Sequence, residues 1–411
     1  MNEKLFHKDF TLVVIGQIIS LFGNATIRFA LPLYLLNLTG SSALYGTVTA
    51  CAFLPALLLS PVGGILADRV NKRNIMVLLD FFTAAAILAF ALFMEKGSLI
   101  LLLTITLMLL YGIAGAYQPA VQASIPALVR QEHYMAANSV INTVSSFAAL
   151  AGPVLGGVLY SAWGLRPVLW VCMACFLLSA IMELFLHIPF RKPASGGILE
   201  TVRNDFGDSI RFLRREKPVI GKALLVICGI NLFLSSMVMV GLPYLITEVL
   251  DLEAAQANRL YGFAEGALAA GGLLGGIGAG LLANRLAIQR VGRLVTACAL
   301  CVLPIGASLV LFSSGIINYV VILICSFALM ACSTVFTVEM MSFIQAETPP
   351  GLLGKVISVI LTVSMCAQPL GNALYGVLFG LCKGLEYVVV FFAGIVSLLL
   401  AVSAGKIFQK V

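Results

Sequence analysis

Twelve apolar runs, each about as long as a lipid bilayer is thick, divide the sequence of 411 residues. An α-helix rises about 1.5 Å per residue, so about 20 apolar residues cross the roughly 30 Å hydrocarbon layer. Hydrophobic residues make up 61% of the chain, more than one soluble core could bury. We therefore predict an all-α integral membrane protein. Its twelve transmembrane helices are expected near 10–36, 45–67, 74–94, 99–121, 138–162, 167–187, 219–246, 259–283, 294–313, 319–344, 354–378 and 387–405.

The distribution of Lys and Arg predicts the orientation of these spans. If both termini are cytoplasmic, the inner connecting segments hold 20 Lys and Arg and the outer ones hold 4. Such an excess is typical of the cytoplasmic side of a membrane protein. We expect a multi-pass protein of the bacterial cytoplasmic (plasma) membrane whose first span is not cleaved. The net charge of +7 is then an orientation signal and does not indicate a nucleic-acid partner.

Internal similarity divides the chain into two halves. The stretch "GILADR" at 64–69 returns as "GLLANR" at 280–285, and "QASIP" at 122–126 returns as "QAETP" at 345–349. Parallel repeats of this kind place a binding site between two bundles. We predict two pseudo-symmetric six-helix bundles. The expected boundaries are 1–188 for the N-terminal bundle, 189–218 for a cytoplasmic linker with an amphipathic helix, and 219–411 for the C-terminal bundle.

The charged loop between the second and third spans reads "GGILADRVNKRNI" at 63–75. Its Lys and Arg residues fit the excess of positive charge expected on the cytoplasmic side. That excess does not explain Asp68, whose negative charge suits the N-terminus of a neighbouring helix. The alternative is a solvated turn. The stretch resembles the loop signature of the major facilitator superfamily, with Asn71 in place of the usual glycine. The resemblance implies a conformational latch in which Asp68 meets the backbone near Gly354 and Lys355. The residues of this latch are Gly64, Asp68, Arg69, Lys72 and Arg73.

The fifth span carries a second family motif, "GPVLGG" at 152–157. It resembles a pattern found in exporters that exchange substrate for protons, and the alternative is an ordinary kinked packing helix. The segments 117–140 and 209–225 resemble the drug:proton antiporter branch that includes macrolide-efflux-type proteins and the enterobactin exporter. The fourth span lacks the arginine that many related drug exporters carry. The residues of the antiporter motif are Gly152, Pro153, Gly156 and Gly157.

Charged residues inside spans are costly in lipid and usually face protein or water. Away from the span ends they are few: Arg28, Asp80, Glu183, Glu265 and Glu339. A carboxyl group in a medium of low dielectric can exchange protons near neutral pH. In the superfamily's fold, helices 1, 4, 7 and 10 line the cavity and helices 3 and 6 are peripheral. The resemblance therefore favours Glu339 as a proton-coupling candidate and a structural role for Asp80 and Glu183. Glu265, in the outer third of the eighth span, is the second coupling candidate. The alternative for both candidates is a hydrogen-bonded or ion-paired structural group.

Polar and aromatic residues on the lining helices are the candidates for contact with substrate. A largely apolar pocket with a few such groups suits bulky amphipathic molecules better than sugars. Each residue has the alternative role of a hydrogen bond between helices. These candidates are Gln17, Asn24, Arg28, Tyr111, Tyr117, Asn231 and Ser235.

No nucleotide-binding motif or catalytic triad occurs, so we expect no enzyme and no cofactor. The CxxC pairs Cys172/Cys175 and Cys298/Cys301 lie in apolar runs and are interpreted as packing residues, with no metal site. The predicted function is proton-coupled export of an amphipathic small molecule by a monomer in the lipid bilayer. Export of a siderophore-like metabolite, lysolipid transport on the same fold and a non-transporting membrane sensor are the alternatives.

Overall fold

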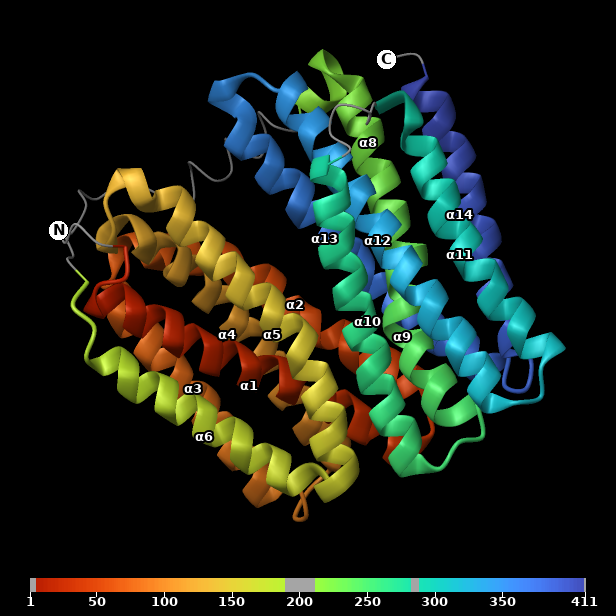
Figure 1. Ribbon diagram of the computed structural model, residues 1–411, viewed down its shortest axis with the longest axis horizontal. Coiled ribbons are helices and arrows are strands. Elements are labelled where there is room, and N and C mark those ends of the chain that lie inside the picture. The colour runs from red at the N-terminus through yellow and green to blue at the C-terminus, as the bar shows by residue number, and fades with distance from the viewer. Residues whose placement is uncertain (1–4, 189–210, 282–287, 410–411) are drawn as a thin grey trace. The chain divides into compact units, whose positions relative to one another are not determined.

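The computed structural model describes residues 5–188, 211–281 and 288–409, apart from the side chains of 61, 64, 65, 67–69, 135, 350, 351 and 354. This part of the chain contains twelve helices that are long and apolar enough to cross a membrane (Figure 1). The prediction of an all-α membrane protein with twelve spans is therefore confirmed. The predicted amphipathic helix at 189–218 lies almost entirely outside the described residues. At its end, Phe212–Glu216 form a π-helical turn, η2.

The first six spans are regular helices joined by short turns. Their bounds are Lys8–Thr39 (α1), Ser42–Arg69 (α2), Lys72–Phe93 (α3), Leu99–Leu128 (α4), Tyr134–Trp163 (α5) and Leu165–Leu184 (α6). A short 3₁₀ turn, η1, precedes α5 at Gln131–His133. Glycine and asparagine set two of the ends. Gly40, with φ 59°, caps α1 in the left-handed conformation that glycine adopts at little cost. The Asn71 side chain accepts a hydrogen bond from the Arg73 amide at the start of α3.

The seventh span is interrupted, whereas the last five are continuous. It comprises α8 (Pro218–Gly229), a π-helical segment η3 (Ile230–Ser235), α9 (Ser236–Tyr244) and a second π-helical segment η4 (Leu245–Val249). A 3₁₀ turn, η5, spans Ile288–Arg290. The later spans are Ala254–Leu281 (α10), Val291–Leu311 (α11), Gly315–Glu347 (α12), Pro350–Leu381 (α13) and Glu386–Phe408 (α14).

The described helices group into two compact units. The first contains α1, α3–α6, α2 from Val48 onward, and α10 as far as Gly266. The second contains α2 as far as Thr47, α8–α9, α10 from Ala267 onward and α11–α14. Thus α2 and α10 each contribute to both units. The division into halves around a linker at 189–218 stays a prediction.

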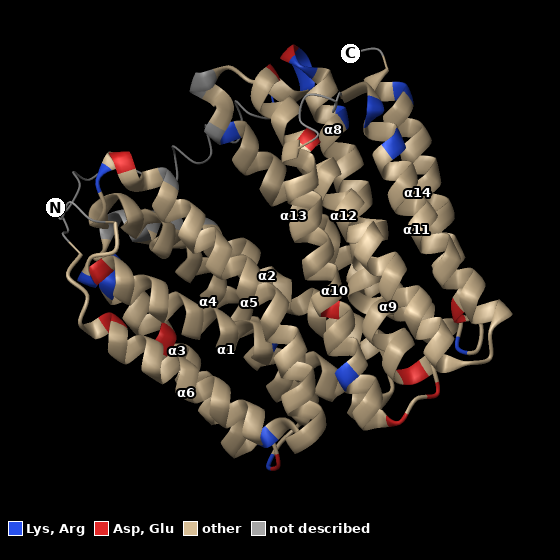
Figure 2. Cartoon of the chain, viewed as in Figure 1, with Lys and Arg blue, Asp and Glu red and all other residues tan. Residues whose placement is uncertain are grey.

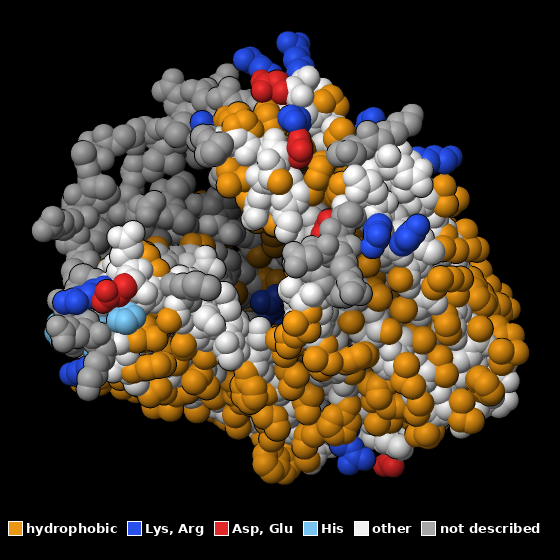
Figure 3. All heavy atoms as spheres, turned by 45° about the horizontal axis from the view of Figure 1, so that its top comes forward, with side chains coloured by type: hydrophobic (Ala, Val, Ile, Leu, Met, Phe, Trp, Pro, Cys, Tyr) orange, Lys and Arg blue, Asp and Glu red, His pale blue; other side chains and the backbone are white. Residues whose placement is uncertain are grey.

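The sides of the helices are apolar. Figure 3 shows orange hydrophobic side chains spread over the visible face. Leu58, Leu225, Leu281 and Leu381 are each at least 70% exposed, far beyond what a water-soluble surface of this size carries. Charged residues instead gather at helix ends, with few within the spans (Figure 2). Both observations agree with a lipid surround for the middle of each helix.

Candidate functional site

Four helices of the first unit, α1, α3, α4 and α6, enclose a cluster of polar side chains. The Tyr117 hydroxyl donates to Glu183 Oε1 at 2.7 Å and accepts from Gln17 Nε2 at 2.8 Å. The Ser20 hydroxyl donates to Asp80 Oδ1 at 3.1 Å, and Ser20 lines the same small cavity as Tyr117. Two hydrogen-bonded groups, one with each carboxyl group, therefore adjoin each other. These five residues are called the polar cluster below.

The polar cluster is buried, and some of its atoms have no partner. Asp80 is 2% exposed, and Glu183 and Gln17 are 0% exposed. Asp80 Oδ2, Glu183 Oε2 and Gln17 Oε1 make no hydrogen bond within the described structure. Buried polar atoms are paired in the great majority of cases, so three orphans in one place indicate a site rather than packing.

A small cavity of about 90 Å³ lies on one side of the polar cluster, within the first unit. Ser20, Asp80 and Tyr117 line it together with Asn24 and Arg28. Tyr117 also belongs to an apolar core, which lies toward the N-terminal end of α1. This core includes Val13, Val14, Met76 and Val121. The polar cluster therefore lies between this small cavity and the apolar core.

Arg28 is held by an aromatic ring and an amide. Its guanidinium carbon lies 3.5 Å from the centre of the Tyr111 ring, and its Nη1 donates to Asn24 Oδ1 at 3.5 Å. A cation above an aromatic face is stabilised by about 0.5–2 kcal/mol, depending on how far water is excluded. The structure thus brings three of the predicted substrate-contact residues together. It places two others, Gln17 and Tyr117, inside the buried polar cluster.

The remaining predicted substrate-contact residues lie in the π-helical segment of the seventh span. Asn231 Nδ2 donates to the Ser364 carbonyl oxygen of α13 at 3.1 Å, and Ser235 donates to Asn231 Oδ1 at 3.4 Å. The Asn231 carbonyl oxygen accepts hydrogen bonds from both the Ser236 backbone amide and the Ser236 hydroxyl, the latter at 2.8 Å. π-helical turns occur frequently at functional sites.

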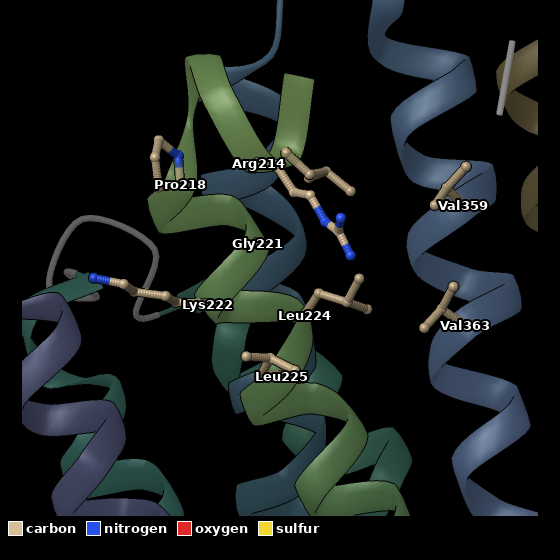
Figure 4. Close-up of a pocket in the computed structure, with 9 residues that line it drawn as sticks. Arg214, Pro218, Gly221, Lys222, Leu224, Leu225, Val359 and Val363 are labelled. Atoms are coloured by element: carbon tan, nitrogen blue, oxygen red, sulfur yellow. The ribbon is translucent and has the colours of Figure 1, made fainter. Parts of the chain in front are cut away.

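A larger cavity, about 460 Å³, lies in the second unit between α8 and α13. This volume is within the range of small-molecule sites. In Figure 4 the Arg214 side chain extends between the two helices and Val359 and Val363 face it from α13, whereas Lys222 points away. The walls are otherwise aliphatic, with Leu213, Leu224 and Leu225 among the lining residues. Such a surface suits an amphipathic molecule.

The two predicted proton-coupling residues are both partly exposed. Glu265 of α10 accepts a hydrogen bond from the Tyr261 hydroxyl at 3.1 Å. Glu339 lies in α12, where the described residues give it no hydrogen bond or ion pair. They lie in different units, and neither belongs to the polar cluster. Their coupling role stays a prediction.

The glycines of the antiporter motif allow close contact between helices of the first unit. A Cβ atom at Gly152 would lie 2.3 Å from the Ala25 Cβ of α1. At Gly157 it would lie 3.0 Å from the Gly262 Cα of α10. Gly156 is less crowded, with the Phe29 ring 3.3 Å away. Pro153 lies within α5. The motif therefore packs α5 against two helices at once, and its role in exchange with protons stays a prediction.

The predicted latch falls at the junction of α2 and α3. The side chains of Gly64, Asp68 and Arg69 are outside the described residues. Lys72 begins α3, and the Arg73 guanidinium donates to the Leu184 carbonyl oxygen at the end of α6. This bond ties the loop to the first unit. The contact expected between Asp68 and the start of α13 stays a prediction.

The four cysteines of the CxxC pairs are free thiols in apolar helices. Cys172 and Cys298 are buried, and Cys175 and Cys301 are half-buried. Over the described ranges, no group of three or more His, Cys, Asp or Glu side chains is arranged to hold a metal ion.

Sequence reasoning assigned Asp80 and Glu183 a structural role and did not connect them with Gln17 and Tyr117. One signal was available. With the spans alternating in direction, all four residues lie in the half of their helix nearest the end at which α1 begins. Residues at a similar depth in the membrane can be in contact if their helices are neighbours. Which spans are neighbours, however, depends on packing that the sequence pattern does not show.

Comparison with known proteins identifies the family of this chain. The sequence model of the Major Facilitator Superfamily matches residues 13–372. Macrolide efflux protein A of Streptococcus pyogenes is 24% identical over 364 residues, which are 87% of this chain and 85% of that protein. Multidrug efflux pump Tap of Mycobacterium bovis is 23% identical over 374 residues, 89% of this chain and 85% of that protein. The fold resembles the crystal structure of nucleoside transporter NupG, with a TM-score of 0.79, 13% identity and coverage of 97% and 99%.

The family match covers most of the chain, and the two relatives described above are efflux proteins that match along 85% or more of both chains. The fold of twelve apolar helices agrees with both findings. The chain is therefore a multi-pass membrane transporter and not an enzyme, and it belongs to the major facilitator superfamily.

Proposed function

We propose that this chain exports amphipathic drugs or related small molecules across the bacterial cytoplasmic membrane, driven by proton influx through alternating access. It works as a monomer with both termini in the cytoplasm. The observation that carries the proposal is the similarity to a macrolide efflux protein along 85% or more of both chains.

The geometry of the second unit supports an amphipathic cargo. The cavity between α8 and α13 offers aliphatic walls and one inward-pointing cation, Arg214. In the first unit, Arg28 and Asn24 supply polar groups beside the Tyr111 ring. Few polar groups set in apolar surroundings give orientation without requiring a densely hydrogen-bonded ligand such as a sugar.

Flux into everted membrane vesicles tests this proposal. Vesicles containing the chain should accumulate a radiolabelled macrolide and an amphipathic dye when their interior is acidic, and a protonophore should abolish the accumulation. Empty vesicles provide the background. Asp68→Asn should impair flux while leaving the amount of inserted protein unchanged, because the latch is expected to bias the conformational equilibrium.

The outcomes separate the alternatives. Flux that persists after the pH gradient is dissipated would contradict proton coupling. Flux of a catecholate siderophore or a lysophospholipid, with no flux of macrolide or dye, would change the proposed cargo but not the assigned fold. Absence of any flux, together with no loss of function in Asp68→Asn, would favour a non-transporting sensor.

A further inference from the structure

The polar cluster of the first unit contains two acidic groups and no compensating cation among its described neighbours. Asp80 and Glu183 approach closely enough to interact electrostatically. The ion pairs found in the described chain lie elsewhere, at Glu95, Glu132 and Glu347. Arg28 lines the same cavity as Asp80, but it forms no ion pair with either carboxyl group, and its guanidinium contacts Tyr111 and Asn24 instead.

Two ionised carboxylates cannot share such a site without a positive charge. Moving a carboxylate out of water is costly unless it is paired and fully hydrogen-bonded, and two that adjoin repel each other. Here each has one oxygen with a donor and one oxygen, Asp80 Oδ2 or Glu183 Oε2, with none. The cluster therefore needs a bound cation, and the smallest is a proton.

We propose that Asp80 and Glu183, connected through Tyr117 and Ser20, form a proton-binding site inside the first unit. The proposal rests on the proposed function, since it names the group that proton influx uses. The facing titratable and charged groups are Asp80 from α3, Tyr117 from α4, Glu183 from α6 and, further along α1, Arg28. In this assignment Asp80 and Glu183 act in coupling, in place of Glu339 or Glu265.

The arrangement lets the proton move between the two carboxyl groups. When Glu183 is protonated, it gives its proton to the Tyr117 oxygen, Tyr117 gives its own to Ser20, and Ser20 gives its own to Asp80. Each hydroxyl oxygen loses one O–H bond as it gains another, Glu183 loses its O–H bond and Asp80 gains one, so only the charge has moved. The first and last steps follow hydrogen bonds of the structure, and the middle step joins Tyr117 and Ser20, which line the same cavity.

The cavity gives the site its access to water. Its volume of about 90 Å³ exceeds the roughly 10–15 Å³ that one water molecule needs on the same measure, so it has room for water. Asp80 lines it, whereas the apolar core closes the side beyond Tyr117. A proton therefore enters and leaves as hydronium at Asp80, and Glu183 is reached only through the relay.

Infrared difference spectroscopy of the purified protein tests this without transport or substrate. Spectra recorded between acidic and alkaline pH should show the C=O band of a protonated carboxyl that disappears on alkalinisation. Asp80→Asn and Glu183→Gln should each remove or shift that band. Glu265→Gln, Glu339→Gln and Asp251→Asn should keep it. Asp251, exposed between η4 and α10, is the matched carboxylate outside the spans.

Thermal unfolding keeps the test decisive if a variant folds poorly. A folded chain that holds a proton loses stability as pH rises, because the unfolded chain holds fewer. The unfolding temperature of the wild type should fall on alkalinisation, and this slope should be smaller in Asp80→Asn and Glu183→Gln, whose neutral amides mimic the protonated form. Tyr117→Phe interrupts the relay and should slow the Glu183 component of the band change after a pH jump while leaving the Asp80 component fast.

Three results would overturn the proposal. The first is a band unaffected by either substitution. The second is a band lost only in Glu265→Gln or Glu339→Gln. The third is a band abolished by Na⁺ at constant pH, which would make the cluster a sodium site. Flux that does not depend on a pH gradient overturns the proposed function alone, since the spectrum reports proton binding whether or not it drives export.

Discussion

Because Gly152 has no side chain, α1 packs closely against α5 at this position. With a Cβ atom the distance to Ala25 Cβ would be 2.3 Å, and both atoms are fixed to backbone, so one helix has to move. At Gly157 the nearest atoms, Asn258 O and Gly262 Cα, are 3.0 Å away. At Gly156 the neighbour is a Phe29 ring edge at 3.3 Å, which can shift by itself.

These distances predict a graded series of alanine substitutions. Gly152→Ala should destabilise the protein most, by about 1–3 kcal/mol as is usual for overpacking, Gly157→Ala less and Gly156→Ala least. Unfolding temperatures measured in detergent would give the order. Gly278→Ala is the control, because no atom lies within 4 Å of its added Cβ. An equal loss at all three motif glycines would show that backbone freedom, and not packing, is what they provide.

At the scale of elements, the π-helical segment Ile230–Ser235 contains one more residue per turn than the helices that flank it. Deleting Leu232 should convert the segment to α-helix with little effect on the register of α8 and α9. Deleting the exposed Leu300 from the regular helix α11 should rotate everything after it and lower the unfolding temperature much more. Similar losses in the two deletions would contradict this interpretation of η3.

The existence of the spans was predictable, whereas their ends and irregularities were not. Apolar length alone indicated twelve helices, yet α12 runs from Gly315 to Glu347 and exceeds the predicted 319–344 because polar residues at a helix end stay in the helix. The π turn at Asn231 depends on a serine contact and on α13, neither of which leaves a sequence pattern. Likewise, the residue types of the polar cluster were visible, but not that Asp80 and Glu183 meet Tyr117.

At the scale of the whole molecule, orientation is the property to test. The short turns place Lys96 and Glu132 at opposite ends of α4. In a cysteine-free background, a membrane-impermeant maleimide added to intact cells should label Lys96→Cys and should label Glu132→Cys only after the cells are opened. The expectation follows from the excess of Lys and Arg on the inner side. The reverse pattern would place both termini outside and contradict the proposed direction of export.

Because α2 and α10 are each continuous helices shared by both compact units, the boundaries between units run through helical backbone. In a typical multidomain protein, a loose connector lets each domain tumble on its own. Here the helical backbone hydrogen bonds continue past Thr47 in α2 and past Gly266 in α10. A hinge at either of these positions would therefore break helical hydrogen bonds, which a loop would not have to do.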